Sequence, residues 1–333
     1  MRSRTSFIFI ALTGLTLFMF AFDLTIGSVT IPLRHVVAAL TGGDCPEVTA
    51  KIIINIRLIK AVVALLAGAA LSVSGLQMQT LFRNPLAGPY VLGISSGASL
   101  GVALFIIGAP ILGLSASFAS IGIAGAAWIG AAAVLAIIAA VGHRIKDIMV
   151  ILILGMMFSS GVSAVVQILQ YLSREESLKA FVIWTMGSLG DVTASQLYIL
   201  IPAIAFGLLL AILTIKPLNL LLLGEEYAIT MGLDLHKSRG LLFLSTTLLA
   251  GTVTAFCGPI GFIGLAMPHV TRMLFNNSDH RILIPGTILT GAIVLLGCDM
   301  LSKLFILPIN AITALLGIPV VVWVVLRNKN ISA

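Results

Sequence analysis

The sequence predicts an all-α protein that crosses a membrane about ten times. Two features of composition indicate this class: 59% of the 333 residues are hydrophobic and only 9% are charged, and the mean hydropathy is +1.16. Soluble domains carry about 25% charged residues, so no soluble core could bury this much apolar surface. Strand-like alternation is missing from the sequence, which argues against an outer-membrane β-barrel.

Apolar runs of roughly 18 residues or more, the length that crosses a bilayer, recur along the whole chain. They predict a single transmembrane domain over residues 1–333. Gly and Pro interrupt the second half, so span limits between residues 240 and 305 are the least sharply defined. The expected spans cover residues 6–26, 58–81, 91–109, 117–141, 147–171, 195–215, 240–256, 258–275, 282–303 and 309–327.

The first span has two interpretations. Arg2 and Arg4 precede an apolar run, as in a signal peptide. The run is longer than a typical signal h-region, however, and no small-x-small cleavage site follows it cleanly. We therefore expect a retained first helix.

The charged residues predict the orientation of the spans. With both termini in the cytoplasm, most of the 19 Lys and Arg residues fall on the inner side, as the positive-inside rule requires. The net charge of +7 is thus a signal of topology. Because the basic residues form no continuous patch, we expect no nucleic-acid partner. Membrane lipid is the expected surrounding.

A polar, proline-broken loop lies between the second and third spans. It runs from Asn84-Pro85-Leu86 through Pro89 to Gly93-Ile94-Ser95-Ser96-Gly97-Ala98. Such backbone is tolerated at membrane depth only where protein or a water-filled cavity satisfies its polar groups. The loop therefore indicates a translocation path rather than a simple anchor.

The longest inner loop follows Lys216-Pro217. Its pattern predicts a short apolar helix, a break at Gly224, and a second short helix that starts with Glu225 and Glu226 and ends at Gly232. Acidic residues suit a helix N-terminus, and glycine suits a helix end. Two such helices would form a compact docking surface on the cytoplasmic face. The alternative is an ordinary amphipathic connector.

Residues 172–194, on the outer side, are too polar to span and too apolar to lie free in water. We expect a short interfacial helix there, with Trp184 at the level of the lipid headgroups.

The sequence lacks the motifs of several enzyme and nucleotide-binding classes. No GxxxxGK[ST] phosphate loop occurs, nor HExxH, nor GxSxG, and charged side chains are nearly absent from span centres, where an ion-coupled carrier usually needs a relay. Cys45, Cys257 and Cys298 show no metal-ligand spacing. We expect no enzyme activity, no metal site and no cofactor, so the energy for transport must come from elsewhere.

Several motifs occur together and in order, and they resemble the FecCD family. These proteins are permease subunits of type II ABC importers for iron-siderophore complexes, haem and vitamin B12. The resemblance covers residues 57–319. It rests on IRLIKAVVALLAGAALSVSGLQMQTLFRNPLAGPYVLGISSGASLGV, WTMGSL, LGEEYAITMGL, CGPIGFIGLAMPHVTRMLF, DHRILIPGTILTGAIVLLGCD and TALLGIPVVVW.

The resemblance implies an assembly in the inner (cytoplasmic) membrane. Two permease subunits of ten helices each would form a homodimer, with the path along the dimer axis. Two copies of a separate ATPase would dock on the cytoplasmic side and a substrate-binding protein on the outer side. Ferric siderophore is the commonest substrate of the family, and haem and cobalamin are the alternatives.

The family's coupling helices, which fit a cleft on the ATPase, match the inner loop. The matching residues are Leu223, Gly224, Glu225, Glu226, Ala228 and Gly232.

Docking of the binding protein is implied for three basic residues at the outer face. Arg57 matches an arginine that pairs with a carboxylate of the binding protein in the vitamin B12 system. Lys60 and Lys303 stand where the family has arginine. Lysine keeps the charge but loses the bidentate fork. The alternative role for Arg57 and Lys60 is snorkelling at the interface.

A cytoplasmic gate is implied by the loop Asn84-Pro85-Leu86 and by Ile148 and Met149 at the start of the fifth span, where an apolar constriction can exclude water. His269 matches the family's Pro-His pair, for which we expect a structural role. The chain departs from the family at residues 306–310, where ILPIN replaces ELPVG. Two other classes stay open: an ion-coupled secondary carrier, and an intramembrane enzyme, which lacks its catalytic residues.

Overall fold

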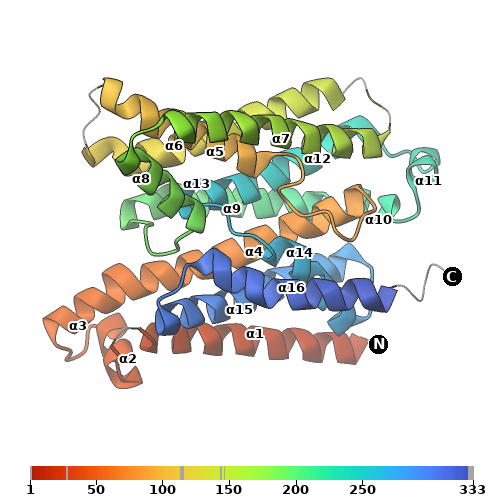
Figure 1. The fold of residues 1–333 in the computed structure, drawn as a ribbon. Helices are drawn as coiled ribbons and strands as arrows, with labels where there is room; N and C mark the ends of the chain where they lie inside the picture. Colours follow the sequence, from red (N-terminus) through yellow and green to blue (C-terminus); the bar gives the residue numbers. More distant parts are fainter. Residues whose placement is uncertain (1, 28, 113–115, 143–144, 146, 329–333) are drawn as a thin grey trace.

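A computed structural model describes residues 2–27, 29–112, 116–142, 145 and 147–328 (Figure 1). In these ranges the regular structure is helical. The long helices are α1 (Arg2–Thr25), α4 (Leu58–Leu81), α5 (Ile94–Leu112), α6 (Ala116–Gly142), α7 (Ile148–Leu172), α9 (Ala194–Leu213), α15 (His280–Phe305) and α16 (Ile309–Asn328). The shorter elements are α2 (Leu33–Thr41), α3 (Glu47–Ile52), η1 (Ile53–Arg57), α8 (Glu175–Met186), α10 (Ile215–Leu221), α11 (Glu225–Thr230), α12 (Leu235–Thr246), η2 (Thr247–Gly251), α13 (Thr252–Cys257) and α14 (Ile263–Phe275).

Every expected span contains a helix, and the all-α membrane class is confirmed. Among the described residues, six helices or continuous helical runs are long and apolar enough to cross a bilayer. The expected span 240–256 lies within one such run, Leu235–Cys257. This run continues through a π-helical turn at η2. The expected interfacial helix is α8.

Two expected boundaries are wrong. The span 258–275 is helical only from Ile263, because Gly258 and Phe262 adopt positive φ angles of 74° and 65° that an α-helix cannot contain. Residues 95–98 belong to helix α5 and not to the loop. The non-helical stretch after α4 therefore ends at Gly93, whose φ of 76° precedes the helix start.

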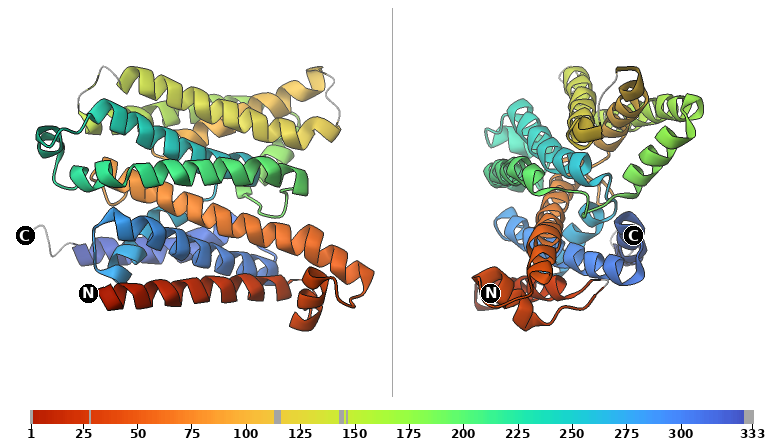
Figure 2. Two further views of the ribbon diagram at one scale, coloured as in Figure 1. Left: turned by 180° about the vertical axis from the view of Figure 1, so that it is seen from behind. Right: turned by 90° about the vertical axis from the view of Figure 1, so that its left-hand side faces the viewer.

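Helix α4 lies at the centre of the molecule. It passes between a group that contains α5 to α13 and a group that contains α1, α14, α15 and α16, as the end-on view also shows (Figure 2). Glycine makes its close crossings possible. A Cβ on Gly68 would lie 2.3 Å from the carbonyl oxygen of Gly291 in α15, and one on Gly75 would lie 1.6 Å from that of Gly264 in α14. Small residues let membrane helices approach this closely.

Short helices lie at both ends of the molecule. The start of α1 and the end of α16 lie at the same end as α10 and α11, whereas α2, α3 and α8 lie at the other (Figure 1). We call α10 and α11, residues 215–230, the knob, and the two ends the knob end and the opposite end. The short helices α2 and α3 were not predicted, although Pro32 and Pro46, which stand directly before them, are a helix-start signal.

Candidate functional site at the knob and along the polar faces

The knob has the predicted construction of two short helices separated by glycine. Leu218 and Leu221 of α10 are buried, and so is Ala228 of α11, which is fully inaccessible. These three side chains belong to one apolar cluster with the knob end of α4. The knob is therefore seated on the transmembrane core and is not a loose connector.

Two glycines set the shape of the knob. Gly224 has φ 109° and ψ 154° at the start of α11, a conformation that L-residues with a Cβ rarely adopt. Gly232 has φ 81° directly after α11. The next residue closes the helix end, because the backbone N–H of Leu233 donates to the carbonyl of Ala228 at 2.9 Å. This is the six-to-one hydrogen bond of a Schellman-type helix end.

The two carboxylates at the start of α11 have different surroundings. Glu225 forms a 2.6 Å ion pair with Arg239 of α12, whose side chain is only 7% exposed. This pair joins α11 to the adjoining membrane helix. Glu226 is exposed, as are Leu223, Tyr227 and Ile229. The surface that the knob offers to a partner therefore combines exposed apolar side chains with the charges of Glu226 and of Lys216 in α10.

A cavity of about 700 Å³ lies beside the knob. Arg83, Ile148 and Met149 form one side, and residues of the knob from Leu223 to Thr230 form the other. Ile148 is buried and Met149 is exposed. Two of the predicted gate residues thus lie next to the predicted coupling residues, at the same end of the molecule.

The other predicted gate residues form a tight turn at the end of α4. The backbone N–H of Leu86 donates to Oδ1 of Asn84 at 2.9 Å, and the backbone N–H of Ala87 donates to the carbonyl of Asn84 at 3.1 Å. Nε2 of His269 lies 2.7 Å from the carbonyl oxygen of Pro85. His269 therefore fastens the turn to α14, which is a structural contact.

The two non-helical segments of the core pack against each other. The hydroxyl of Tyr90 donates to the carbonyl of Ile260 at 3.1 Å, so the loop after α4 is joined to the segment before α14. The backbone N–H of Ser188 donates to the carbonyl of Cys257 at 2.8 Å. Asn310 lies in the segment 306–310, where the sequence departs from the motif ELPVG. Its Oδ1 accepts from the backbone N–H of Gly261 at 3.0 Å. Motifs far apart in the sequence thus satisfy one another's backbone groups.

The sequence analysis did not identify the buried polar side chains at the knob end of α4. Gln77 is fully buried and lies within 3.2 Å of the hydroxyls of Thr214 and Ser245. Gln79 accepts from Nη1 of Arg272 at 2.6 Å. The run Gln77-Met78-Gln79 within an apolar helix was the available signal, since buried amides in a membrane need partners.

The three predicted docking cations lie at the opposite end. Arg57 is 6% exposed, and its guanidinium donates to the carbonyls of Leu24 (2.9 Å) and Thr25 (2.8 Å), and also to that of Val29. Its charge therefore holds the turn after α1 in place.

Lys60 and Lys303 belong to a group of four charges that we call the charge cluster: Asp23, Lys60, Asp299 and Lys303. The Lys303 ammonium lies 2.8 Å from both Asp23 and Asp299, and Lys60 lies 3.1 Å from Asp299. Both carboxylates are fully buried, whereas the Lys60 side chain is 20% exposed. The sequence analysis did not identify the participation of Asp23 from the first helix.

A polar cavity of about 420 Å³ lies between α5, α7 and α8. Helix α7 contributes a stripe at positions three and four residues apart, which places its members on one face of the helix. The lining includes no charged residue. It is formed mainly by Ser95, Ser96, Ser99, Ser159, Ser163, Gln167 and Gln170.

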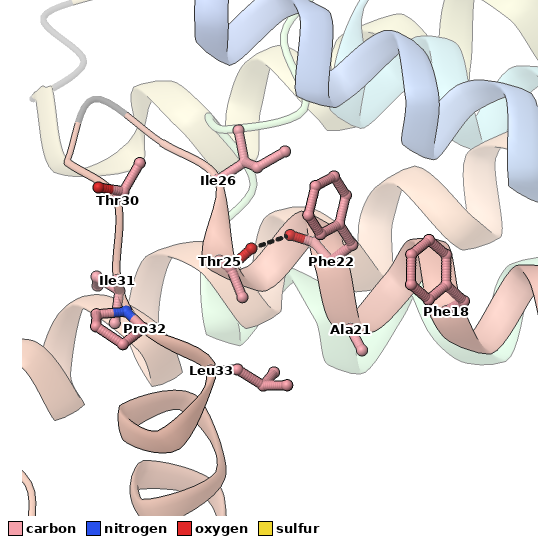
Figure 3. A pocket seen from close by; sticks show the side chains of 9 residues that line it. All are labelled: Phe18, Ala21, Phe22, Thr25, Ile26, Thr30, Ile31, Pro32 and Leu33. Carbon is pink, nitrogen blue, oxygen red and sulfur yellow. Dashed lines mark hydrogen bonds between the residues drawn. The ribbon is translucent and has the colours of Figure 1, made fainter.

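A further cavity, of about 610 Å³, has a different character (Figure 3). It lies between the end of α1 and the start of α2, and Phe18, Phe22 and Leu33 contribute apolar side chains to it. The hydroxyl of Thr25 is used within the helix, since it donates to the carbonyl of Phe22 at 2.7 Å. Thr30 is the other polar residue of the lining, which is otherwise apolar.

Metal binding has no candidate in the ranges that the structure describes, where no three His, Cys, Asp or Glu side chains gather as ligands. The three cysteines are free thiols, of which Cys257 and Cys298 are buried.

Comparisons with known proteins agree with this architecture. The chain is 38% identical over 287 residues to the hemin transport system permease protein HmuU of Yersinia pestis, covering 83% of each protein. It is 38% identical over 285 residues to the vitamin B12 import system permease protein BtuC of Klebsiella pneumoniae, covering 83% of this chain and 82% of the relative. A solved inward-facing metal-chelate type ABC transporter matches with a TM-score of 0.83 and 30% identity, over 97% of this chain and 99% of that one.

The repeated membrane helices and the knob define a multi-pass permease subunit of an ABC importer. The sequence matches the FecCD transport family over residues 15–327, and the chain belongs to this family. It is a transport subunit and not the ATPase of the system.

Proposed function

We propose that this chain carries a ferric siderophore or a related iron chelate across the inner membrane, driven by two copies of a separate ATPase. The observation that carries this proposal is the knob: a pair of short helices that is fixed to the membrane core and exposes apolar side chains beside Glu226. Both ends of the chain would be cytoplasmic, because the start of α1 and the end of α16 lie at the knob end (Figure 1).

The role of the knob in coupling follows from its mechanics. A rigid surface can convert closure of an ATPase dimer into movement of the helices on which it is seated. Leu223 and Glu226 would contact the ATPase, whereas Gly224, Ala228 and Gly232 would hold the shape and Glu225 would hold the knob to α12 through Arg239. The cavity beside the knob would give the ATPase room to engage.

The polar cavity between α5 and α7 supports a path between two copies of the chain. Helix α7 packs on α5 and α6, and it leaves Met157 and Tyr171 exposed. A stripe of serine and glutamine is unfavourable against lipid tails, so we infer that this face borders water at the axis of a homodimer. The neutral, hydrogen-bonding lining suits a large polar chelate. Asn84, Pro85, Leu86, Ile148 and Met149 would form the gate at the knob end.

Docking of the binding protein would use the opposite end, and the exposures favour Lys60 among the three cations. We expect Lys60→Gln to weaken binding of the cognate binding protein to the permease in proteoliposomes by about tenfold, the effect of losing one charge contact at an interface. Lys51→Gln is the matched control, because Lys51 is 67% exposed and pairs only with Glu47 in its own helix.

Arg57→Gln and Lys303→Gln should act differently in the same measurement. All three cations have partners inside the protein, but Arg57 is buried and the Lys303 side chain is only 9% exposed, whereas Lys60 is partly exposed beside Asp299. We expect these variants to lower the midpoint of thermal unfolding more than the affinity for the binding protein. Unchanged affinity in Lys60→Gln together with a large loss in Arg57→Gln would assign docking to Arg57 instead.

The substrate is tested by the ligand of the cognate binding protein. We expect that protein to bind a ferric siderophore more tightly than haem or cobalamin. The two relatives named for hemin and for vitamin B12 make these the alternatives. Binding of haem or cobalamin alone would replace the proposed substrate without changing the proposed mechanism.

A further inference from the structure

The side-chain amide of Asn219 in α10 forms hydrogen bonds with the start of α15 through both its oxygen and its nitrogen. Its Oδ1 accepts from the backbone N–H of His280 at 2.9 Å and lies 2.7 Å from Nδ1 of the same residue. Its Nδ2 donates to Oδ1 of Asp279 at 2.7 Å. Asp279 is also the N-cap of α15, because Oδ1 accepts from the backbone N–H of Arg281 at 2.9 Å.

These contacts determine the protonation of the His280 ring. The backbone N–H can only donate, so the atom facing it is the amide oxygen, which can only accept. Nδ1 of His280 must therefore carry a proton. His280 is fully buried, and a neutral ring avoids the cost of burying a charge. Nε2 is then an acceptor facing the hydroxyl of Thr80, 2.9 Å away on α4, whose single proton is shared between this nitrogen and the carbonyl of Leu76 at 3.0 Å.

The relay Asn219–His280–Thr80 thus joins the knob to two core helices at once. Helix α15 has 26 residues, so it extends about 39 Å at 1.5 Å per residue. Its far end carries Asp299 and Lys303 of the charge cluster. Along the way it crosses α4 closely at Gly291 and Gly68. A displacement of α10 would therefore reach the opposite end through one continuous helix, which contains Pro285 near the knob.

The hydrogen bonds of the relay are directional, whereas apolar packing is not. Leu218 and Leu221 hold α10 against the core, but apolar contact has no direction. The hydrogen bonds of Asn219 fix both the register and the angle of α10 relative to α15.

We propose that Asn219, His280 and Thr80 are positioning residues that transmit movement of the knob to α15 and α4, and so link ATPase closure to the substrate path. This inference rests on the proposed coupling role of the knob. The three residues act by keeping three helices in one relative position.

The test is Asn219→Ala in the permease reconstituted with its ATPase and binding protein. We expect ATP hydrolysis and co-elution with the ATPase to persist, and substrate transported per ATP hydrolysed to fall about tenfold, within the range of coupling changes that buried network residues produce. Asn277→Ala is the matched control: this exposed asparagine accepts only from the backbone N–H of Asp279 within the adjoining loop.

A second variant examines the far end of the relay. Thr80→Val removes the hydroxyl and keeps the shape, and Thr80 is 4% exposed on α4, so it cannot alter the surface that the ATPase contacts. We expect the same fall in transport per ATP. A normal ratio in both variants would overturn the inference. Loss of ATPase binding in Asn219→Ala with a normal ratio in Thr80→Val would also overturn it, because Asn219 would then only shape the docking surface. If the wild-type permease binds no ATPase, the proposed function itself fails.

Discussion

Glu226→Arg is expected to reduce ATP-driven uptake about a hundredfold while leaving the permease folded. Glu226 is exposed beside the apolar side chains that the knob presents, so its replacement strains no contact inside the chain. At an interface the same change turns an attraction into a repulsion, and like charges brought together at an interface cost several kcal/mol. The measurement is uptake into proteoliposomes that contain the permease, its ATPase and its binding protein.

Glu225→Gln separates coupling from stability. Glu225 is bonded to Arg239, which is nearly buried, so this variant should lower the midpoint of thermal unfolding and impair uptake less than Glu226→Arg. The coupling role of Glu226 would be contradicted by normal uptake in Glu226→Arg, or by equal losses in the two variants accompanied by equal destabilisation.

Gly75→Ala is expected to destabilise the folded protein strongly. A Cβ at this position would lie 1.6 Å from the carbonyl oxygen of Gly264 and 2.4 Å from its carbonyl carbon. Both atoms are backbone, so no side chain can turn away, and α4 and α14 would have to separate. Overpacking of a core costs about 1–3 kcal/mol and occasionally more, and we expect the upper end of this range. The thermal midpoint of the detergent-solubilised protein, followed by size-exclusion chromatography, measures the effect.

Gly125→Ala is the matched control, because it makes the same change in another membrane helix, α6. A Cβ there would meet no atom within 4 Å. This variant should keep or slightly raise the thermal midpoint, since alanine favours a helix over glycine. Similar midpoints for the two variants would show that the close crossing of α4 and α14 is not required.

Local signals were sufficient to predict the knob. The glycine break and the two carboxylates of residues 224–226 act within a few residues, and the structure has both short helices where the pattern indicated them. Span positions were predictable for a similar reason, because the length of an apolar run relates directly to bilayer thickness.

Long-range pairing was not predictable from the sequence. Asp23 and Lys303 form an ion pair across 280 positions, and neither residue signals the other. The short length of α14 depends on the positive φ of Phe262, a conformation that no aromatic residue favours by itself. Contacts with distant segments hold the stretch that contains Phe262, since the hydroxyl of Tyr90 donates to the carbonyl of Ile260.

The charge cluster bears on the distinction between an ABC importer and an ion-coupled carrier, because a carrier could bind its coupling ion at Asp23 and Asp299. The most direct measurement is substrate uptake by the reconstituted permease, with its binding protein present, under two separate energy sources. If the proposed function is right, uptake requires the ATPase and ATP hydrolysis and ignores proton and sodium gradients. Uptake that follows an ion gradient without the ATPase would contradict it.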